Sequence, residues 1–253
     1  PALPSMTTWV NLRELGAKGD GETDDTKAIQ AAIDQYDNIY VPQGWYRITE
    51  TLKMKPNTKL IGLHPFGTQF RLDESTPAFS GFGGPKAMVE SSVGGANMLV
   101  GIGINTGGIN YRAVGVKWMA NADSYINDVK FVGGHGGMWK PKPGVAAPKG
   151  WWDRPARVST PDNPVSASGM DLAWDNQYWS LWVTNNGGGT FKDIWTASTY
   201  ATSGFYANNT STPGRIYAMS IEHHVRNEVR FNKVSNWKVY CMQTEEESRE
   251  STE

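Results

Sequence analysis

The C-terminal third of the chain repeats itself every 23 residues. WVTN at 182–185 aligns with FYAN at 205–208 at this offset. Two further sets of residues recur at the same spacing: Ile194, Tyr217 and Tyr240, and Thr196, Met219 and Met242. A period of this length is typical of a solenoid, in which each coil holds about three short strands and three turns. We therefore predict three successive coils here, and regular coils over residues 172–247.

The composition favours strands over helices. Charged residues are only 19% of the chain, whereas there are 28 glycines and 11 tryptophans. Few long charged side chains are available to cover helix surfaces, and turn formers are abundant. INDVKF at 126–131 and FKDIWT at 191–196 share one pattern, which predicts earlier coils of the same stack. The expected fold class is all-β.

One helix is predicted near the N-terminus. Asp24 or Asp25 can N-cap a helix that carries Ala28, Ile29 and Ile33. Asp20, Asp24 and Asp25 are interpreted as turn and capping residues. Short strands at 39–41, 46–48 and 59–62 follow, each ended by a turn. We expect residues 10–63 to form the N-terminal cap and the first coils.

These residues carry a family resemblance. GAKGDGETDDTKAIQAAI at 16–33 and IYVPQGWYRI at 39–48 resemble the N-terminal signature of the pectate-lyase-3-like superfamily. Its members are right-handed parallel β-helices, including exo-β-1,3-glucanases of glycoside hydrolase family 55, relatives of the polygalacturonases, and phage tailspikes. The resemblance covers about the first sixty residues. It implies a right-handed parallel β-helix with an N-terminal capping helix, but the superfamily contains hydrolases, lyases and binding proteins.

The whole chain, 1–253, is predicted to be one β-helix domain with one large interruption. Residues 133–169 are rich in Trp, Pro and Gly and do not follow the period. Irregular segments of this length are usually functional or disordered, and the tryptophans favour an ordered loop beside the binding face. The last coil runs into EEESRESTE without a further apolar element. Since solenoids need a polar cap, we expect the native chain to continue.

Charge and hydropathy exclude some classes of binding partner. Lys plus Arg number 24 and Asp plus Glu 25, so no basic excess is available to bind nucleic acid. The chain contains no run of eighteen apolar residues, which is about the length that a membrane-spanning helix needs. The chain starts at Pro1, which is compatible with a removed targeting signal. We expect a secreted or periplasmic protein that acts on a polysaccharide and needs no cofactor; the oligomeric state stays open.

Tryptophans provide the candidate sugar-binding surface. A parallel β-helix leaves one long face open, on which sugar rings can stack against indole rings. Trp179, Trp182 and Trp195 are the best candidates, since they lie on or next to the repeating strands. The alternative is that these tryptophans pack the irregular segment onto the solenoid.

The candidate catalytic groups are carboxylates. The 23-residue offset places Glu222 and Glu245 at one position of adjacent coils, about 5 Å apart at the usual strand spacing. Two carboxylates this close favour one protonated and one ionised partner, as acid-assisted glycoside hydrolysis requires. A close pair suits a retaining hydrolase, whereas an inverting one needs about 6.5–9.5 Å. Family 55 enzymes are inverting, so the resemblance implies Glu246 or a residue of another coil as the partner.

Basic residues surround Glu222. His223 and His224 are adjacent on a predicted strand, so they should point to opposite sides of the sheet. One of them, or Arg226, could bind a sugar hydroxyl or position a carboxylate. We predict no metal site, because no third ligand follows the histidines at a regular spacing. Calcium bound by Asp and Glu residues, as in many pectate lyases, stays open as the alternative, although no calcium loop is recognisable.

Two alternatives to a hydrolase stay open. A polysaccharide lyase acting on a uronic-acid polymer would need cations near the substrate carboxylate, and the candidates are Arg215, Arg226, Arg230 and Lys238. A non-catalytic carbohydrate-binding β-helix would keep the aromatic surface and use the carboxylates only as hydrogen-bond acceptors.

Overall fold

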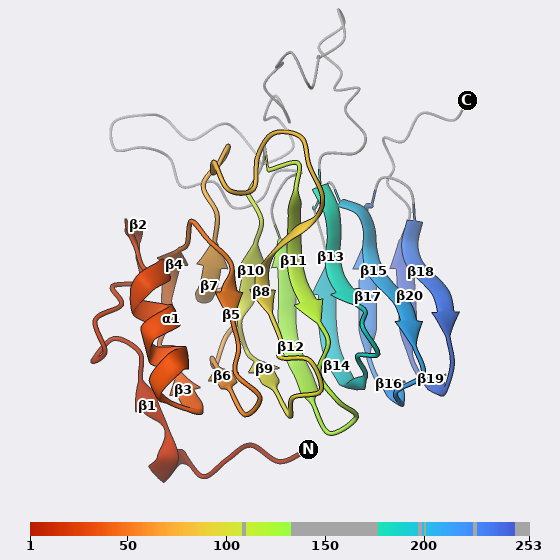
Figure 1. Ribbon diagram of the computed structural model, residues 1–253, viewed down its shortest axis with the longest axis horizontal. Coiled ribbons are helices and arrows are strands. Elements are labelled where there is room, and N and C mark those ends of the chain that lie inside the picture. The colour runs from red at the N-terminus through yellow and green to blue at the C-terminus, as the bar shows by residue number, and fades with distance from the viewer. Residues whose placement is uncertain (108–109, 133–176, 197–198, 200, 225–226, 246–253) are drawn as a thin grey trace, which may run out of the picture.

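A computed structural model describes residues 1–107, 110–132, 177–196, 199, 201–224 and 227–245. Its strands form a parallel β-solenoid of about seven turns (Figure 1). All described strand pairings are parallel, and each joins strands of successive coils. The prediction of an all-β parallel solenoid is confirmed, while its right-handed sense stays a prediction.

Each coil contributes strands to three faces, which we name by their order along the chain. The first face contains β1 (Val10–Asn11), β3 (Asn38–Tyr40), β6 (Lys59–Ile61), β9 (Met98–Val100), the first halves of β12 (Tyr125–Val132) and β14 (Gly189–Thr196), β16 (Gly214–Ile216) and β19 (Trp237–Val239). The second face contains β2 (Asp20–Asp24), β4 (Gly44–Arg47), β7 (Thr68–Arg71), β10 (Gly103–Asn105), the second halves of β12 and β14, β17 (Met219–Glu222) and β20 (Met242–Glu245).

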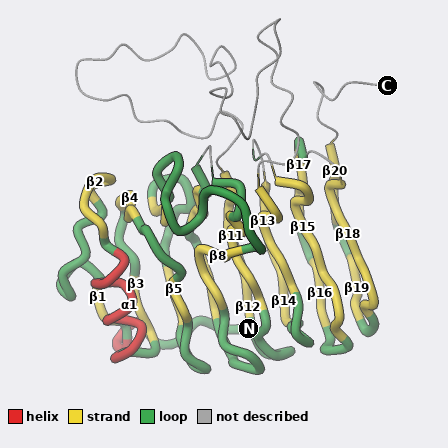
Figure 2. Tube along the Cα trace, turned by 45° about the horizontal axis from the view of Figure 1, so that its top comes forward, coloured by secondary structure: helices red, strands yellow, loops and turns green. Residues whose placement is uncertain are grey.

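The third face is a separate six-stranded sheet. Its strands are β5 (Leu52–Lys53), β8 (Lys86–Glu90), β11 (Ala113–Trp118), β13 (Gln177–Val183), β15 (Ala201–Thr210) and β18 (Asn227–Val234). A short 3-10 helix, η1 (Met6–Thr8), precedes the first strand. Figure 2 shows the three strand rows as stacked coils.

The long strands β12 and β14 pass from the first face to the second. Asp128 and Asp193 have positive φ values of 51° and 50° at equivalent places in these strands. Ile126 pairs with Phe191 and Val129 with Ile194. The prediction that these two segments belong to the same stack is therefore confirmed, and the structure shows that their coils are neighbours.

The 23-residue spacing is correct for only one pair of neighbouring coils, the one that contains β16 and β17 and the one that contains β19 and β20. Met219 pairs with Met242 and Ile216 with Val239 at this offset. Trp182, however, pairs with Tyr206 instead of Phe205, an offset of 24, and Ile194 pairs with Met219 instead of Tyr217, an offset of 25. Thr196 likewise pairs with Ile221 instead of Met219. Those predicted registers are wrong because successive coils differ in length, and a shift of one residue moves a side chain to the other side of a sheet.

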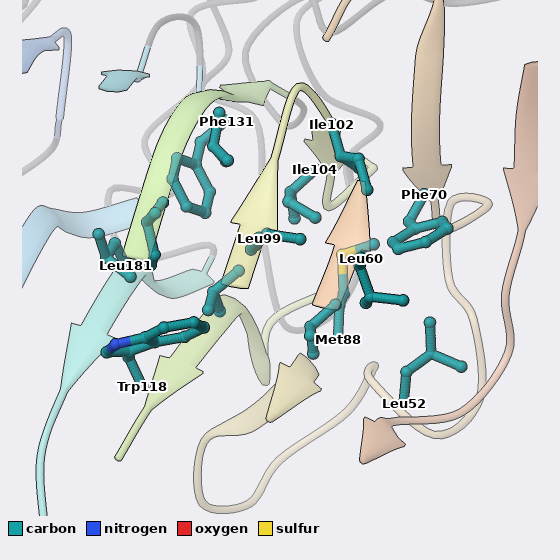
Figure 3. Close-up of a cluster of buried hydrophobic side chains, with 14 of the residues drawn as sticks. Leu52, Leu60, Phe70, Met88, Leu99, Ile102, Ile104, Trp118, Phe131 and Leu181 are labelled. Atoms are coloured by element: carbon teal, nitrogen blue, oxygen red, sulfur yellow. The ribbon is translucent and has the colours of Figure 1, made fainter. Parts of the chain in front are cut away.

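The inward side chains of all three faces form one continuous core. Figure 3 shows Leu60, Leu99 and Phe131 pointing into this interior. Burying an aliphatic or aromatic side chain of this size contributes about 1.5–3 kcal/mol, so the stack is held mainly by its apolar interior. Trp118 is fully buried, and its Nε1 donates to Ser124 Oγ at 3.0 Å and to Gly188 O at 3.1 Å.

The predicted helix is present as α1 (Thr26–Gln35). It lies at the N-terminal end of the stack in Figure 1. Along the chain it follows β2 and precedes β3, a position at which later coils have a strand of the third face. Ile29 and Ile33 are buried in the core, and α1 contacts β5. Asp25 occupies the N-cap position, but the carboxylate that accepts the Thr26 N–H belongs to Asp24. The function of this helix as a cap for the stack stays a prediction.

The residues that the structure does not describe follow strands of the second face. Residues 133–176 follow β12, 197–198 and 200 follow β14, 225–226 follow β17, and 246–253 follow β20. The interruption predicted at 133–169 thus lies outside the described residues. The boundaries proposed for the domain and its parts stay predictions.

Candidate functional site

Glu222 and Glu245 lie beside each other on the second face. They are paired residues of β17 and β20, so the register predicted for these two glutamates is confirmed. Met219 and Ile221 of β17 are buried, which directs the alternate residues Ser220 and Glu222 outward. The Glu245 side chain is 57% exposed, whereas Glu222 is half-buried. The two carboxylates therefore share one outward surface.

A hydroxyl group holds the Glu222 carboxylate in place. Ser220 Oγ donates to Glu222 Oε1 at 2.6 Å. Ser220 Oγ also lies at hydrogen-bond distance from Gln243 Oε1, on the adjacent coil. One oxygen of Glu222, Oε1, is thus engaged with Ser220.

His223 extends the pair to three potential ligands. Its backbone has a φ of 61°, its N–H donates to Glu245 O at 2.9 Å, and its Nε2 lies 3.7 Å from Glu245 Oε1. Glu222, His223 and Glu245 each place one ligand atom within 4.8 Å of the others. The sequence analysis found no third ligand at a regular spacing, whereas the coil stack brings Glu245 close to Glu222 and His223. The absence of a metal site stays a prediction.

His224 points the other way. The two histidines diverge as predicted, but they follow the end of β17 and do not lie on a strand, and His223 has a left-handed backbone. The His224 ring is buried, with Nδ1 2.6 Å from Glu228 Oε2 and Nε2 2.9 Å from Thr199 Oγ1. Because a carboxylate can only accept, Nδ1 carries the proton and Nε2 accepts from Thr199. Burial lowers the pKa of His224, and the adjacent Glu228 carboxylate opposes this effect. His224 thus supports the corner under the site and has no exposed surface for a sugar.

The structure separates the three predicted tryptophans. Trp195 lies on the second face and pairs with Ser220. Trp179 and Trp182 lie on the third face, where their ring centroids are 4.7 Å apart. Trp182 Nε1 donates to Asn208 Oδ1 at 2.7 Å, and Lys117 Nζ lies 5.1 Å from the Trp182 ring centroid. Only Trp195 shares a face with the paired glutamates.

Phe66 is a neighbour of this site that the sequence analysis missed. Its ring meets the Trp195 ring edge to face, with centroids 5.8 Å apart. The sequence signal was present, because GLHPFG at 62–67 places an aromatic residue in a turn bounded by glycines. What could not be predicted is that this turn lies over a strand of a later coil.

The cations proposed for a lyase lie on other faces. Arg215 and Lys238 are paired on the first face, and Arg230 lies on the third face with its guanidinium 4.9 Å from the Tyr206 ring centroid. Arg226 and Glu246 lie outside the described residues. Of the four predicted cations, none of the three described ones is on the face of Glu222.

A second charged group lies on the same face, at the N-terminal end. Arg47 Nε and Arg71 Nη2 each lie 2.5 Å from an oxygen of Asp73. Arg47 and Arg71 are paired residues of β4 and β7, several coils from Glu222. Because both guanidinium groups share one carboxylate, we regard this cluster as part of the fold.

The family model described as rhamnogalacturonase A/epimerase, pectate lyase-like, matches residues 9–243. A probable glucan endo-1,3-beta-glucosidase of Arthroderma benhamiae is 44% identical over 61 residues, which cover 23% of this chain and 7% of the relative. Alginate lyase 7 of Azotobacter vinelandii is 42% identical over 64 residues, 21% of this chain and 8% of that protein. The chain thus spans less than a tenth of either relative.

Among solved structures, the catalytic unit of a GH87 α-1,3-glucanase from Streptomyces thermodiastaticus is 14% identical, with a TM-score of 0.44 over 96% of this chain and 43% of the glucanase chain. Within the described residues, no helix has the length and apolar character needed to span a membrane.

The family model extends over nearly the entire chain, and the parallel solenoid is the architecture expected of that family. The glucosidase and the alginate lyase are carbohydrate-active by name. The resemblance to pectate-lyase-like β-helices is thereby confirmed, and the chain belongs to the rhamnogalacturonase A/epimerase, pectate lyase-like family.

Proposed function

We propose that this protein hydrolyses glycosidic bonds in a neutral extracellular polysaccharide, with Glu222 and Glu245 as the catalytic carboxyls. The observation that carries the proposal is the pairing of these residues on adjacent coils, with an oxygen of each within 4.8 Å of the other. The name of the glucosidase relative supports a glucan as the substrate class.

Glu222 is the acid in this mechanism. Ser220 donates to its Oε1, which leaves Oε2 to hold a proton and deliver it to the glycosidic oxygen. Loss of the protonated oxygen from the anomeric carbon breaks the glycosidic bond. The hydrogen bond from Ser220 holds the Glu222 side chain in one orientation, so less conformational freedom is lost when the acid takes part in the reaction.

Glu245 is the nucleophile. The close approach of the two carboxylates leaves less room than the 6.5–9.5 Å or so that an inverting enzyme uses to admit water between them. Glu245 would bond to the anomeric carbon as the leaving group departs. Water, deprotonated by Glu222, would then break that covalent bond and release the sugar with its original configuration.

A lyase is the second candidate. Glu222, His223 and Glu245 form a ligand set that could hold a cation, and a cation would neutralise the carboxylate of a uronic acid. The alginate lyase relative supports this alternative. Against it, Arg215, Arg230 and Lys238 lie on other faces than Glu222.

Product analysis distinguishes the candidates. The protein and its Glu222→Gln variant would be incubated with neutral glucans and with uronic polymers. New reducing ends without unsaturated, ultraviolet-absorbing products, lost in the variant, are the expected result. Unsaturated products would establish the lyase instead, and no product from any polymer would favour a non-catalytic carbohydrate-binding protein.

The matched control is Glu14→Gln. Glu14 is exposed in the turn after β1 and lies far from the second-face carboxylates in the coil order. This variant should cleave neutral glucan like the parent, so that a loss seen only in Glu222→Gln reports the site and not a general effect of removing a carboxylate.

A further inference from the structure

We propose that Phe66 and Trp195 form a sugar-binding subsite next to the carboxylate pair, and that this subsite takes an uncharged sugar ring. The inference rests on the proposed function for its substrate class. The position of the two aromatic rings stands independently on the geometry of the second face.

Two glycines allow the loop of Phe66 to reach across the stack. Phe66 lies in the turn before β7, and Trp195 lies in β14, three strands further along the second face. At the usual strand spacing this is a distance of about 14 Å. A Cβ atom on Gly103 would collide with Pro65 O, and one on Gly101 with Gly62 O. The absence of side chains on these glycines lets the turn lie directly on the neighbouring coil.

The loop is ordered by its own hydrogen bonds. Gly67 N donates to His64 Nδ1 at 3.0 Å, and Thr68 N donates to His64 O at 2.8 Å. Gln69 Nε2 donates to Phe66 O at 3.2 Å. These bonds hold the backbone on both sides of Phe66, so the ring is presented to Trp195 at little cost in conformational entropy.

The aromatic pair lies one sugar unit from the carboxylates. Trp195 pairs with Ser220, and Glu222 is two residues further along β17 on the same side of the sheet. One strand spacing combined with two residues along a strand separates the Cα atoms of Trp195 and Glu222 by about 8 Å. A sugar ring stacked on Trp195 would therefore place a neighbouring glycosidic oxygen near Glu222.

The chemistry of this surface favours an uncharged ring. Phe66 is 36% exposed and Leu63, in the same turn, is 67% exposed, so apolar surface is available for the C–H groups of a sugar. The neighbouring cation, Lys130, donates to Asp193 O at 2.9 Å and lies 3.3 Å from Asp128 Oδ1. It is thus already engaged and poorly placed to bind a uronate.

The third-face tryptophans differ in this respect. Lys117 lies over the Trp182 ring, and the ring centroids of Trp179 and Tyr206 are 4.7 Å apart. Because these rings contact a cation and one another, less of their surface is open to a sugar. Trp179 and Trp182 therefore serve as a control, an aromatic surface of the same molecule that should not bind the sugar.

Calorimetric titration of the full chain tests the subsite. Glu222→Gln would serve as a binding form without turnover, with a β-1,3-glucan oligosaccharide and a mannuronate oligosaccharide as probes. Phe66→Ala and Trp195→Ala in this background should each weaken glucan binding about fivefold or more, the loss expected for one well-packed ring contact. Trp195→Phe should recover part of the affinity, and mannuronate should bind more weakly than glucan.

The controls are Phe82→Ala and Trp182→Ala. Phe82 is 86% exposed in the turn between β7 and β8, and Trp182 lies on the third face. Neither substitution should change the dissociation constant. Thermal melts would identify a variant that fails to fold, and Trp195→Phe then replaces Trp195→Ala in the comparison.

The possible results distinguish failure of the proposed subsite from failure of the proposed hydrolysis. Unchanged glucan affinity in Phe66→Ala and in a folded Trp195→Ala, or no glucan binding at all, overturns the subsite even if the parent hydrolyses glucan. Tighter binding of mannuronate overturns the preference for a neutral ring. Affinity lost in both aromatic variants, combined with a parent that cleaves nothing, supports the subsite and removes the proposed hydrolysis.

Discussion

The Gln30 side chain bonds both backbone groups of Lys53. Gln30 Nε2 donates to Lys53 O at 3.0 Å, and Lys53 N donates to Gln30 Oε1 at 2.8 Å. Gln30 lies on α1, and Lys53 lies in β5, the end strand of the third face. An amide side chain thus takes the place of a neighbouring strand at the edge of a sheet, where unpaired backbone groups would otherwise invite association with another chain.

This relationship predicts a measurable loss of stability. Gln30→Ala should lower the free energy of unfolding by about 1 kcal/mol, since each exposed hydrogen bond contributes about 0.5–1.5 kcal/mol at most. Gln35→Ala, at an exposed position of the same helix, is the control and should change stability far less. Urea denaturation measures both. Equal stability of the two variants would contradict a capping contribution from this contact.

The buried His224 predicts a pH dependence of stability. Burial lowers its pKa in the folded state, so the unfolded chain binds the proton more readily. The stability that His224 contributes is therefore present above about pH 6.5, its ordinary pKa, and is lost as the pH falls below that value. Denaturant unfolding between pH 8 and pH 5 should show this decline.

His224→Gln keeps hydrogen-bonding groups at this position but cannot titrate. Its unfolding free energy should change less between pH 8 and pH 5 than that of the parent. His64→Gln, at an exposed histidine of the turn before β7, should retain the slope of the parent. A slope identical in all three proteins would assign the pH dependence to other groups.

Asp20 predicts resistance to mild acid. Hydrogen bonds from the backbone N–H groups of Thr23 and Glu22 lower its pKa to about 2. A depressed carboxyl pKa stabilises the fold above the unfolded value of about 3.9, and this contribution is lost as the pH falls from about 4 to about 2. Asp20→Asn should reduce stability at pH 6 and reduce its change over that acid range. Asp123→Asn, at an exposed turn position, should follow the parent curve.

The stereochemistry of the product tests the role of Glu245. A carboxylate pair this close predicts a retaining reaction, so nuclear magnetic resonance of fresh product should show the original anomeric configuration. An inverted product would instead make Glu245 a base or exclude it from the reaction. In that case the family 55 resemblance would be the better guide, and the partner of Glu222 would come from another coil.

Several features followed from local sequence. The glycine and aspartate pattern before residue 26 predicted a turn and a helix, because capping and αL conformations depend on neighbouring residues alone. Matching strand patterns predicted that residues 126–131 and 191–196 belong to one stack of coils, because alternation along a strand determines which side chains enter the core. The pairing of Glu222 with Glu245 followed from the one pair of coils whose spacing is 23 residues.

Other features depended on the tertiary structure. Coil lengths of 24 and 25 residues changed the partners of Trp182 and Ile194, since register is a property of the whole stack. Phe66 reaches Trp195 only because glycines of an intervening coil lie under its loop. His223 gains Glu245 as a neighbour because β20 stacks beside β17. The sequence alone therefore determined which residues form strands, turns and core, whereas side-chain contacts between coils were decided by loop lengths and close backbone packing, which act between residues far apart in the chain.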